Sequence, residues 1–326
     1  MESKKPVVLV ALDTVEELYA MLEEHFEIIR PPKGRDFTKA ELIERIGSVD
    51  ALCSVFDIPI DKEIIDAGKK LRIIANYAVG FNNIDIEYAR QKGIAVTNTP
   101  RAVVAPTAEL ALALMLAATR RVAEWDRLLR KEQSSLKPSR LDRLGVDLYG
   151  KTLGIAGFGN IGRAVAQRAQ AFGMRILYYK RHRLDIAEEN ALGVTYMPAD
   201  ELFRASDIVS LHMPYNKDSH HFVDAARLAL MKPNALLINT ARGAVVDEDA
   251  LVTALTEKRI ACAALDVFED ADRPDARLYE LDNVVMTPHV GTQTYDARVS
   301  MARELCNALE GYFFRNGEGV PFVVRA

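Results

Sequence analysis

A chain of 326 residues is long for one domain and comfortable for two, and 49% of its residues are apolar, enough for a sizeable core. Its 42 basic and 46 acidic side chains leave a net charge of −4, which argues against a protein that binds nucleic acid or a membrane surface. No apolar run approaches the roughly 20 residues of a membrane span. Cys53, Cys262 and Cys306 lie far apart without a CxxC pair, which favours a reduced cytoplasmic protein and suggests no metal site.

Short apolar runs alternate with helical patterns along almost the whole chain. Helical stretches of about 8–15 residues separate most of these runs. The alternation predicts βαβ units in an α/β fold, and uninterrupted apolar strands are typical of parallel sheets covered on both faces. The runs expected to form strands cover residues 7–12, 51–55, 71–76, 94–98, 152–158, 175–179, 208–212, 235–239, 262–268 and 284–288.

Two long helical patterns, residues 106–133 and 295–315, interrupt this rhythm. Because they flank the middle of the chain, they predict that the chain leaves one domain, builds a second and returns to the first. We therefore expect a discontinuous domain of residues 1–102 and 291–326 with a second domain, residues 103–290, inserted into it. Both domains should be Rossmann-like or flavodoxin-like.

A glycine-rich loop joins the strand expected at 152–158 to the helix that follows it. The segment "GFGNIG" has the G-x-G-x-x-G spacing, in which the glycines allow a tight turn, close approach of backbone to a pyrophosphate, and helix–strand packing. The N–H groups of the loop and the helix dipole then face an anion. The inserted domain is therefore predicted to bind a dinucleotide. The residues expected to line this site are Gly157, Phe158, Gly159, Asn160, Ile161 and Gly162.

The basic stretch "KRHR" follows the next strand and bears on the choice of cofactor. A carboxylate just beyond that strand would accept hydrogen bonds from the ribose 2′-hydroxyl of NAD. Here the position is Lys180, eighteen residues after Gly162, followed by Arg181. Both cations would give a 2′-phosphate charge-assisted hydrogen bonds, so NADP(H) is favoured over NAD(H). Arg183 is included in this site, although it and His182 could equally be solvated neighbours.

Five motifs occur in the order of a known family. The chain resembles the D-isomer-specific 2-hydroxyacid dehydrogenases nearly end to end, and most closely their glyoxylate/hydroxypyruvate reductase and 2-ketogluconate reductase branches. The resemblance implies an NADPH-preferring reductase that converts small 2-keto acids to D-2-hydroxy acids, with residues 103–290 as the nucleotide domain. The motifs are "NYAVGFNNID" (76–85), "GFGNIG" (157–162), "INTARGAVVDEDAL" (238–251), "AALDVFE" (263–269) and "TPHVGTQT" (287–294).

The same resemblance implies roles for individual residues. Arg242 would hold the substrate carboxylate and lie near the keto oxygen, and His289 would be the acid/base. The turn at Val79 and Gly80 would offer backbone N–H groups to the carboxylate from the other domain. Four further residues would line the cofactor, although Thr107 could equally be a residue of a helix N-terminus. They are Thr107, Pro214, Thr240 and Asp266, the last reaching the nicotinamide amide.

One position departs from the family. The glutamate that normally pairs with the catalytic histidine would fall at Ala271, between Asp270 and Asp272. A shift of one residue could bring Asp272 into that role, or His289 could have no carboxylate partner. In the second case the pKa of His289 should fall, and reduction should weaken as pH rises through neutrality.

Two other functions remain open from the sequence. One is a nucleotide-sensing binding protein on the same fold, and the other is a dehydrogenase of another small anion such as formate. A homodimer is also implied by the resemblance, with the helix at 106–133 as the contact, but an intramolecular role for that helix would look the same.

Overall fold

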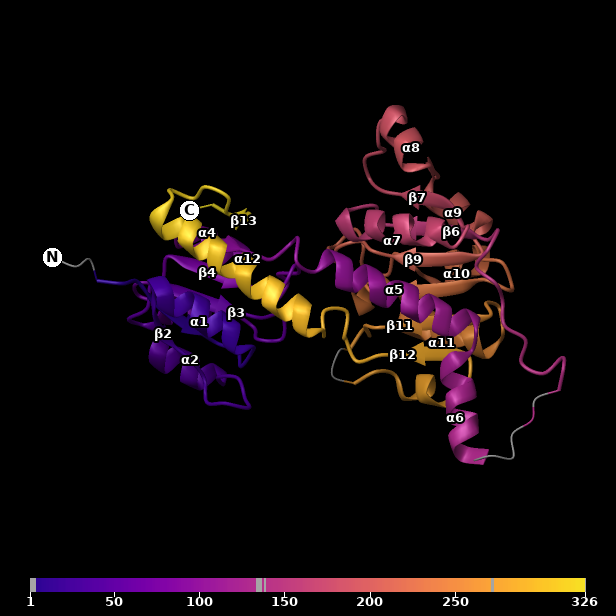
Figure 1. The fold of residues 1–326 in the computed structure, drawn as a ribbon, viewed down its shortest axis with the longest axis horizontal. Coiled ribbons are helices and arrows are strands. Elements are labelled where there is room, and N and C mark those ends of the chain that lie inside the picture. The colour runs from indigo at the N-terminus through magenta and orange to yellow at the C-terminus, as the bar shows by residue number, and fades with distance from the viewer. Residues whose placement is uncertain (1–3, 133–136, 138, 271–272, 326) are drawn as a thin grey trace. The chain divides into compact units, whose positions relative to one another are not determined.

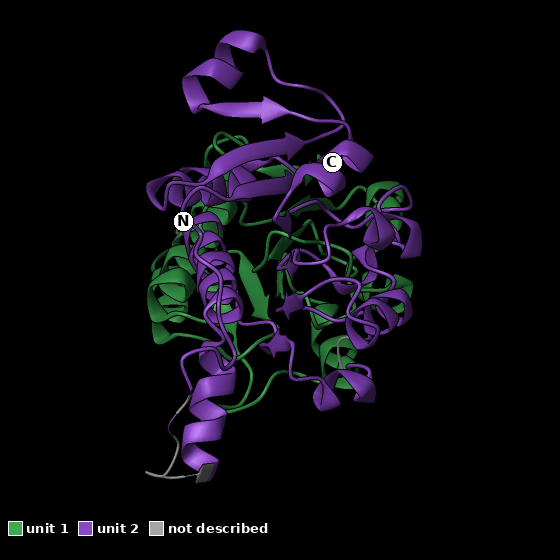
Figure 2. Ribbon diagram, turned by 90° about the vertical axis from the view of Figure 1, so that its right-hand side faces the viewer, with its two compact units in different colours: residues 1–103, 292–326 green, residues 104–291 purple. Residues whose placement is uncertain are grey.

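The chain folds into two compact α/β units. The computed structural model describes residues 4–132, 137, 139–270 and 273–325. Residues 1–103 and 292–326 form unit 1, and residues 104–291 form unit 2 (Figure 2). The α/β class and the parallel sheets expected from the alternation of strands and helices are confirmed in both units. No helix among the described residues is both long enough and apolar enough to cross a membrane.

Unit 1 contains a sheet in the order β13-β5-β4-β3-β1-β2, in which β13 alone runs antiparallel to its neighbour (Figure 1). Apolar side chains of α2, α3 and α4 pack with alternate strand residues into one core, and α1 packs against α12. The strands are β1 (Val7–Val10), β2 (Glu27–Ile29), β3 (Ala51–Ser54), β4 (Ile73–Asn76), β5 (Ala95–Thr97) and β13 (Phe322–Val324); the helices are α1 (Glu16–His25), α2 (Lys39–Ile46), α3 (Lys62–Ala67), α4 (Ile86–Gln91) and α12 (Tyr295–Phe314).

Unit 2 is built on a parallel sheet in the order β12-β11-β10-β9-β6-β7-β8. The strands are β6 (Thr152–Ala156), β7 (Arg175–Tyr179), β8 (Val194–Tyr196), β9 (Ile208–Leu211), β10 (Leu236–Asn239), β11 (Cys262–Leu265) and β12 (Val284–Met286); the helices are α5 (Val104–Thr119), α6 (Val122–Glu132), α7 (Asn160–Ala171), α8 (Ile186–Leu192), α9 (Ala199–Ala205), α10 (Ala225–Leu230) and α11 (Glu248–Thr256), with short 3₁₀ turns at Gly243–Val245 and Ala276–Glu280.

Helices cover both faces of this sheet, as its apolar strands predict. Neighbouring residues of β10 point to opposite faces because strand side chains alternate. Leu237 packs in the core that contains α9, α10 and α11, whereas Ile238 packs in the core that contains α5 and α7. In Figure 1, α5 and α7 lie side by side over the sheet.

The helix expected at 106–133 is broken into α5 and α6, which corrects the sequence prediction. Arg121 has a left-handed backbone with a φ of 53°. The carbonyl of Thr119 accepts a hydrogen bond from the N–H of Val146 (2.8 Å) instead of continuing the helix. Gly145 permits this approach, because a Cβ there would lie 2.6 Å from the Thr119 carbonyl oxygen. A tertiary contact therefore ends α5.

The expected strands are all present, and most are shorter than expected by one to three residues. Three further strands, β2, β8 and β13, were not predicted. Each has three residues and lies at or next to the edge of its sheet, so it lacks the long apolar run that marks a central strand.

Candidate active site

The carboxyl ends of the strands of unit 2 bring most of the predicted site residues to one edge of the sheet. All its strand pairs are parallel. The chain continues from β6 to β7 on one side of β6, while β9 lies on the other side, so the strand order reverses between β6 and β9. Ligands bind at such a switch point in open α/β sheets. The residues that follow these strand ends are Gly157, Lys180, His212, Thr240, Asp266 and Thr287.

The glycine loop has the geometry of a phosphate cradle. Gly157 has a φ of 96°, and a Cβ there would lie 2.4 Å from the backbone nitrogen of Met213. At Gly162 a Cβ would lie 2.4 Å from the carbonyl oxygen of Gly157, whereas at Gly159 it would meet no atom within 4 Å. Gly159 is the N-cap of α7 and has no side chain to cap the helix, so the first N–H groups of α7 stay available to an anion. These features fit a dinucleotide pyrophosphate.

Phe158, in the glycine loop, anchors the loop to the core of unit 2. The Phe158 side chain is buried and its ring lies 4.5 Å from that of Tyr178. The guanidinium carbon of Arg163 lies 5.5 Å from the Phe158 ring centroid. The Phe158 side chain therefore belongs to the core, and only its backbone can face the cofactor.

The basic residues after β7 have different surroundings. Lys180 is half-buried and, within the part of the chain that the structure describes, pairs with no carboxylate. Arg181 is exposed and forms an ion pair with Asp218 (Nη2 to Oδ2, 3.3 Å). His182 is exposed. Lys180 and Arg181 thus both lie just after β7, and no described carboxylate pairs with Lys180.

Arg183 has a structural role that the sequence did not reveal. Its guanidinium makes two 2.8 Å hydrogen bonds to the buried carboxylate of Glu189. The Tyr178 hydroxyl donates to the same carboxylate (2.6 Å), and these bonds lower the pKa of Glu189 to about 2. Because Glu189 already holds the Nε and Nη2 edge of this guanidinium, the proposed phosphate site does not include Arg183.

Arg242 follows β10 on a turn that Asn239 fixes. The Asn239 side chain accepts a hydrogen bond from Ala241 N–H (3.0 Å) and donates one to the Arg242 carbonyl (3.0 Å). The Arg242 guanidinium donates to the Ala241 carbonyl (2.6 Å), and no described carboxylate pairs with it. Burial lowers its pKa. A desolvated cation without a counter-ion is costly, and its planar fork matches the geometry of a carboxylate.

His289 lies on a turn after β12 that is built on Asp266. It is exposed and has a φ of 52°, in the left-handed region. Its backbone N–H donates to the carbonyl of Asp266 (2.9 Å). The buried Asp266 carboxylate accepts hydrogen bonds from the same turn, and burial raises its pKa. Thr107, in the first turn of α5, adjoins this turn, because a Cβ on Gly291 would lie 3.5 Å from its hydroxyl oxygen.

His212 is a candidate site residue that sequence reasoning missed. It follows β9 at the switch point, and its backbone N–H donates to the Ala156 carbonyl (2.8 Å). Its Nε2 lies 2.8 Å from Ser210 Oγ, and its Nδ1 lies 3.5 Å from Thr240 Oγ1. Desolvation lowers the pKa of His212 to about 3, so the imidazole is neutral. The available signal was its position as the first residue after a strand.

Pro214 is exposed on the loop after β9, and its carbonyl accepts a hydrogen bond from Ser219 Oγ (2.8 Å).

In unit 1, the turn at Val79 and Gly80 is held by its carbonyls, which accept hydrogen bonds from the side chains of Asn98 (2.7 Å) and Asn76 (2.6 Å). The two N–H groups of this turn have no acceptor among the described residues, so they are available to an anion.

Ala271 and Asp272 lie outside the described residues, so the alternatives for the partner of His289 stay as the sequence left them. Within the described ranges, no group of three or more His, Cys, Asp or Glu side chains could hold a metal ion.

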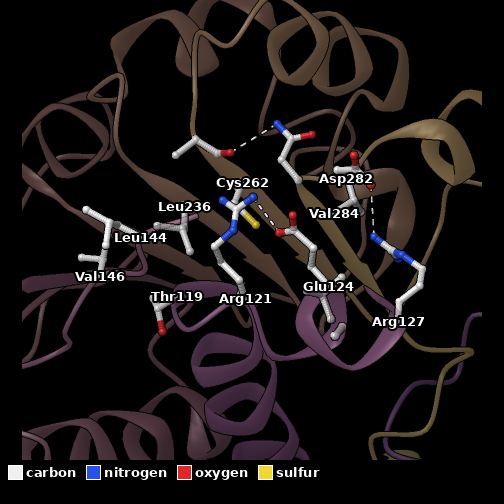
Figure 3. A pocket seen from close by; sticks show the side chains of 15 residues that line it. Thr119, Arg121, Glu124, Arg127, Leu144, Val146, Leu236, Cys262, Asp282 and Val284 are labelled. Atoms are coloured by element: carbon white, nitrogen blue, oxygen red, sulfur yellow. Dashed lines mark hydrogen bonds and ion pairs between the residues drawn. The ribbon is translucent and has the colours of Figure 1, made fainter. Parts of the chain in front are cut away.

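A cavity of about 100 Å³ lies at the opposite edge of the sheet of unit 2. It is lined by the first residues of three strands, Leu236, Cys262 and Val284, and by the start of α6. Figure 3 shows Arg121 directed at Glu124 beside Cys262. Glu124 also pairs with Arg143, so its charge is already neutralised, and the cavity is separate from the candidate active site.

The glycine cradle and the switch-point residues define a dinucleotide-binding oxidoreductase. Residues 112–291 match the family model described as D-isomer specific 2-hydroxyacid dehydrogenase, NAD binding domain. A glyoxylate reductase of Thermococcus onnurineus is 45% identical over 323 residues, which cover 98% of this chain and 96% of that protein.

Solved structures agree over the whole chain. A glyoxylate reductase from Paecilomyes thermophila superposes with a TM-score of 0.87 at 33% identity, covering 99% of each chain. An NADPH-dependent glyoxylate/hydroxypyruvate reductase from Sinorhizobium meliloti, in complex with NADP and malonate, has a TM-score of 0.86 at 30% identity and covers 99% of this chain and 100% of that one. The chain belongs to the D-isomer-specific 2-hydroxyacid dehydrogenase family, as its motifs indicated, and is an NAD(P)-dependent oxidoreductase.

Proposed function

We propose that this protein is an NADPH-preferring reductase of small 2-keto acids, namely glyoxylate, hydroxypyruvate or 2-ketogluconate, and that it forms D-2-hydroxy acids. The observation that carries this proposal is the desolvated guanidinium of Arg242, which lacks a described carboxylate partner at the edge of the sheet where His289 also lies. The glyoxylate reductases among its relatives support the substrate class. Unit 1 would serve as the substrate domain and unit 2 as the nucleotide domain.

Few residues would carry out the steps of keto-acid reduction. When bound, the dinucleotide supplies the hydride for C2 of the keto acid. Arg242 binds the carboxylate through its planar fork and stabilises negative charge on the keto oxygen. In unit 1, the backbone N–H groups of Val79 and Gly80 would bind a carboxylate. His289 delivers a proton to the keto oxygen during reduction and removes it during oxidation.

The preference for NADPH rests on the residues after β7. Lys180 has no described carboxylate partner, and the acidic residue that contacts the ribose of NAD in such folds is absent here. Lys180 and Arg181 would therefore bind the 2′-phosphate. Thr107, Thr240, Pro214 and Asp266 would line the rest of the cofactor.

We also propose a homodimer. Its contact would include α6, which presents the exposed apolar side chains of Val122 and Leu129. Light scattering should give twice the chain mass of 36.3 kDa, and Leu129→Glu should shift the protein toward the monomer. A monomeric wild-type protein would overturn this proposal.

The function is tested by initial rates with the three keto acids, each with NADPH and NADH at matched concentration. We expect faster turnover with NADPH. Lys180→Ala should raise KM for NADPH about tenfold with little change for NADH, because one charge-assisted phosphate contact is lost. Lys151→Ala is the control, because Lys151 lies just before β6, at the edge of the sheet opposite to Lys180. Equal rates with both cofactors would refute the NADPH preference, and cofactor binding without turnover of any of the three acids would refute the substrate assignment.

A further inference from the structure

The ion pair between Arg181 and Asp218 joins two loops at the carboxyl edge of unit 2. Arg181 follows β7, and Asp218 lies in the loop after β9. Their atoms Nη2 and Oδ2 are 3.3 Å apart, and the side chains are 68% and 82% exposed. Arg181 has no other described partner. Without a ligand, its guanidinium therefore pairs with Asp218 alone.

The backbone under Asp218 is fixed although its side chain is exposed. Asn216 Oδ1 accepts hydrogen bonds from the N–H groups of Asp218 (2.9 Å) and Ser219 (3.2 Å). The hydroxyl of the buried Ser219 donates to the carbonyl of Pro214 (2.8 Å) and accepts from Asn216 N–H (2.8 Å). These bonds fix the backbone at Asp218, from which its exposed carboxylate reaches Arg181.

This arrangement sets up a competition. A 2′-phosphate carries a charge of about −1.5 to −2 and would bind the same Arg181 guanidinium that pairs with Asp218. To bind it, Arg181 must weaken its contact with Asp218, and Asp218 then stays as an uncompensated negative charge near the phosphate. The ribose 2′-hydroxyl of NADH is neutral, so it meets neither cost, and the ion pair can stay intact.

We propose that Asp218 is a specificity-determining residue, whose carboxylate competes with the 2′-phosphate for Arg181 and so narrows the discrimination between NADPH and NADH. This inference rests on the proposed function in one respect, that Arg181 faces the 2′-phosphate. Competition by Asp218 would allow the enzyme to use both cofactors. With NADPH the Arg181 guanidinium binds the phosphate, and with NADH the guanidinium stays paired with Asp218.

The expected size of the effect is modest. Exposed ion pairs contribute up to about a fivefold change in an equilibrium constant. Repulsion between Asp218 and a doubly charged phosphate several ångströms away adds a similar factor in dilute salt, and this part is screened at high ionic strength. Removing the Asp218 charge should therefore strengthen binding of the phosphorylated cofactor about three- to tenfold.

The test measures binding directly by calorimetry with NADP⁺, NAD⁺, adenosine 2′,5′-bisphosphate and 5′-AMP. Asp218→Asn should lower Kd for NADP⁺ and the bisphosphate about three- to tenfold, and should change Kd for NAD⁺ and 5′-AMP less than twofold. The gain should shrink in 0.5 M salt. In the background of Arg181→Gln, the same substitution should have a much smaller effect, because the shared partner is gone.

Asp185→Asn is the matched control. Asp185 is an exposed carboxylate in the same region, the N-cap residue of α8, and its side chain makes no capping hydrogen bond. It gives the same change in net charge without touching Arg181, so it should leave the ratio of the two affinities unchanged.

The outcomes separate this inference from the proposed function. If Asp218→Asn shifts Kd for NADP⁺ and NAD⁺ equally, or shifts neither, Asp218 is not a specificity residue, even when the wild-type enzyme prefers NADPH. If the wild-type enzyme shows no preference but Asp218→Asn creates one that depends on Arg181, the proposed NADPH preference fails and the role of Asp218 stands.

Discussion

The carboxylate of Asp266 holds the turn that carries His289. Its Oδ1 accepts hydrogen bonds from the Thr287 hydroxyl (2.6 Å) and from Val290 N–H (2.8 Å), and its Oδ2 accepts one from Gly291 N–H (3.0 Å). A left-handed backbone at a residue other than glycine costs about 1 to 3 kcal/mol, so His289 needs such support to keep its φ of 52°.

Thr287→Val should therefore lower kcat about three- to tenfold and leave KM for the cofactor within twofold. The substitution keeps the shape of the side chain but removes one donor to Asp266, which loosens the turn at His289. Steady-state kinetics at saturating cofactor measure this. Thr256→Val, in α11, is a matched control whose hydroxyl donates only within its own helix. An unchanged kcat in Thr287→Val would show that this hydrogen bond does not position His289.

Arg242→Lys should reduce kcat/KM for the keto acid by about 100-fold or more. Lysine keeps the charge but cannot present a planar pair of donors to a carboxylate. Binding of the dinucleotide alone should stay within twofold of the wild-type value, which calorimetry checks. A small loss of activity in Arg242→Lys would mean that the substrate carboxylate is held mainly by other groups.

Gly159→Ala and Gly162→Ala should separate cofactor approach from helix packing. A Cβ at Gly159 meets no protein atom within 4 Å and the φ there is −87°, so the variant should be as stable as the wild-type protein. It should still lose at least tenfold in affinity for NADP⁺, because the methyl group would crowd the pyrophosphate.

At Gly162 a Cβ would lie 2.4 Å from the Gly157 carbonyl oxygen and 3.2 Å from Ile155 Cγ2. Gly162→Ala should therefore destabilise the fold by about 1 to 3 kcal/mol as well as weaken binding. Thermal unfolding and calorimetry on the two variants measure both effects. Wild-type affinity in Gly159→Ala would contradict a pyrophosphate at this glycine.

The fold was largely predictable because its central strands are apolar runs between helical patterns. The short strands β2, β8 and β13 have no such run, and their pairing depends on the neighbouring strands. The break between α5 and α6 depends on the contact between Thr119 and Val146, which are far apart in the sequence, so the pattern of residues within the helix does not predict it.

Within the site, sequence reasoning found residues that a motif or a strand end marks, such as Gly157 and Lys180. It missed relationships between strands that are adjacent only in the folded sheet. His212 lies beside the glycine loop because β9 pairs with β6, although the two residues are far apart in the sequence. Arg183 was assigned to the phosphate because its pairing with Glu189, one turn into α8, could not be read from charge alone.

His212 should make the stability of the protein depend on pH in a specific direction. Burial lowers its pKa in the folded state to about 3 from an ordinary value of 6.5, so protonation favours the unfolded chain. The stability that the neutral imidazole provides is therefore fully present above pH 6.5 and is lost progressively as pH falls toward 3.

His212→Asn removes this ionisation and keeps a hydrogen-bonding side chain beside Ser210. The wild-type protein should lose stability relative to His212→Asn between pH 6.5 and 4.5, with a slope of up to about 1.4 kcal/mol per pH unit, because one proton is taken up on unfolding. Urea unfolding midpoints at several pH values in this range measure the difference, and His182→Asn, at an exposed histidine, is the control. Parallel pH dependences for the wild-type protein and His212→Asn would show that the imidazole does not stay neutral in the folded state.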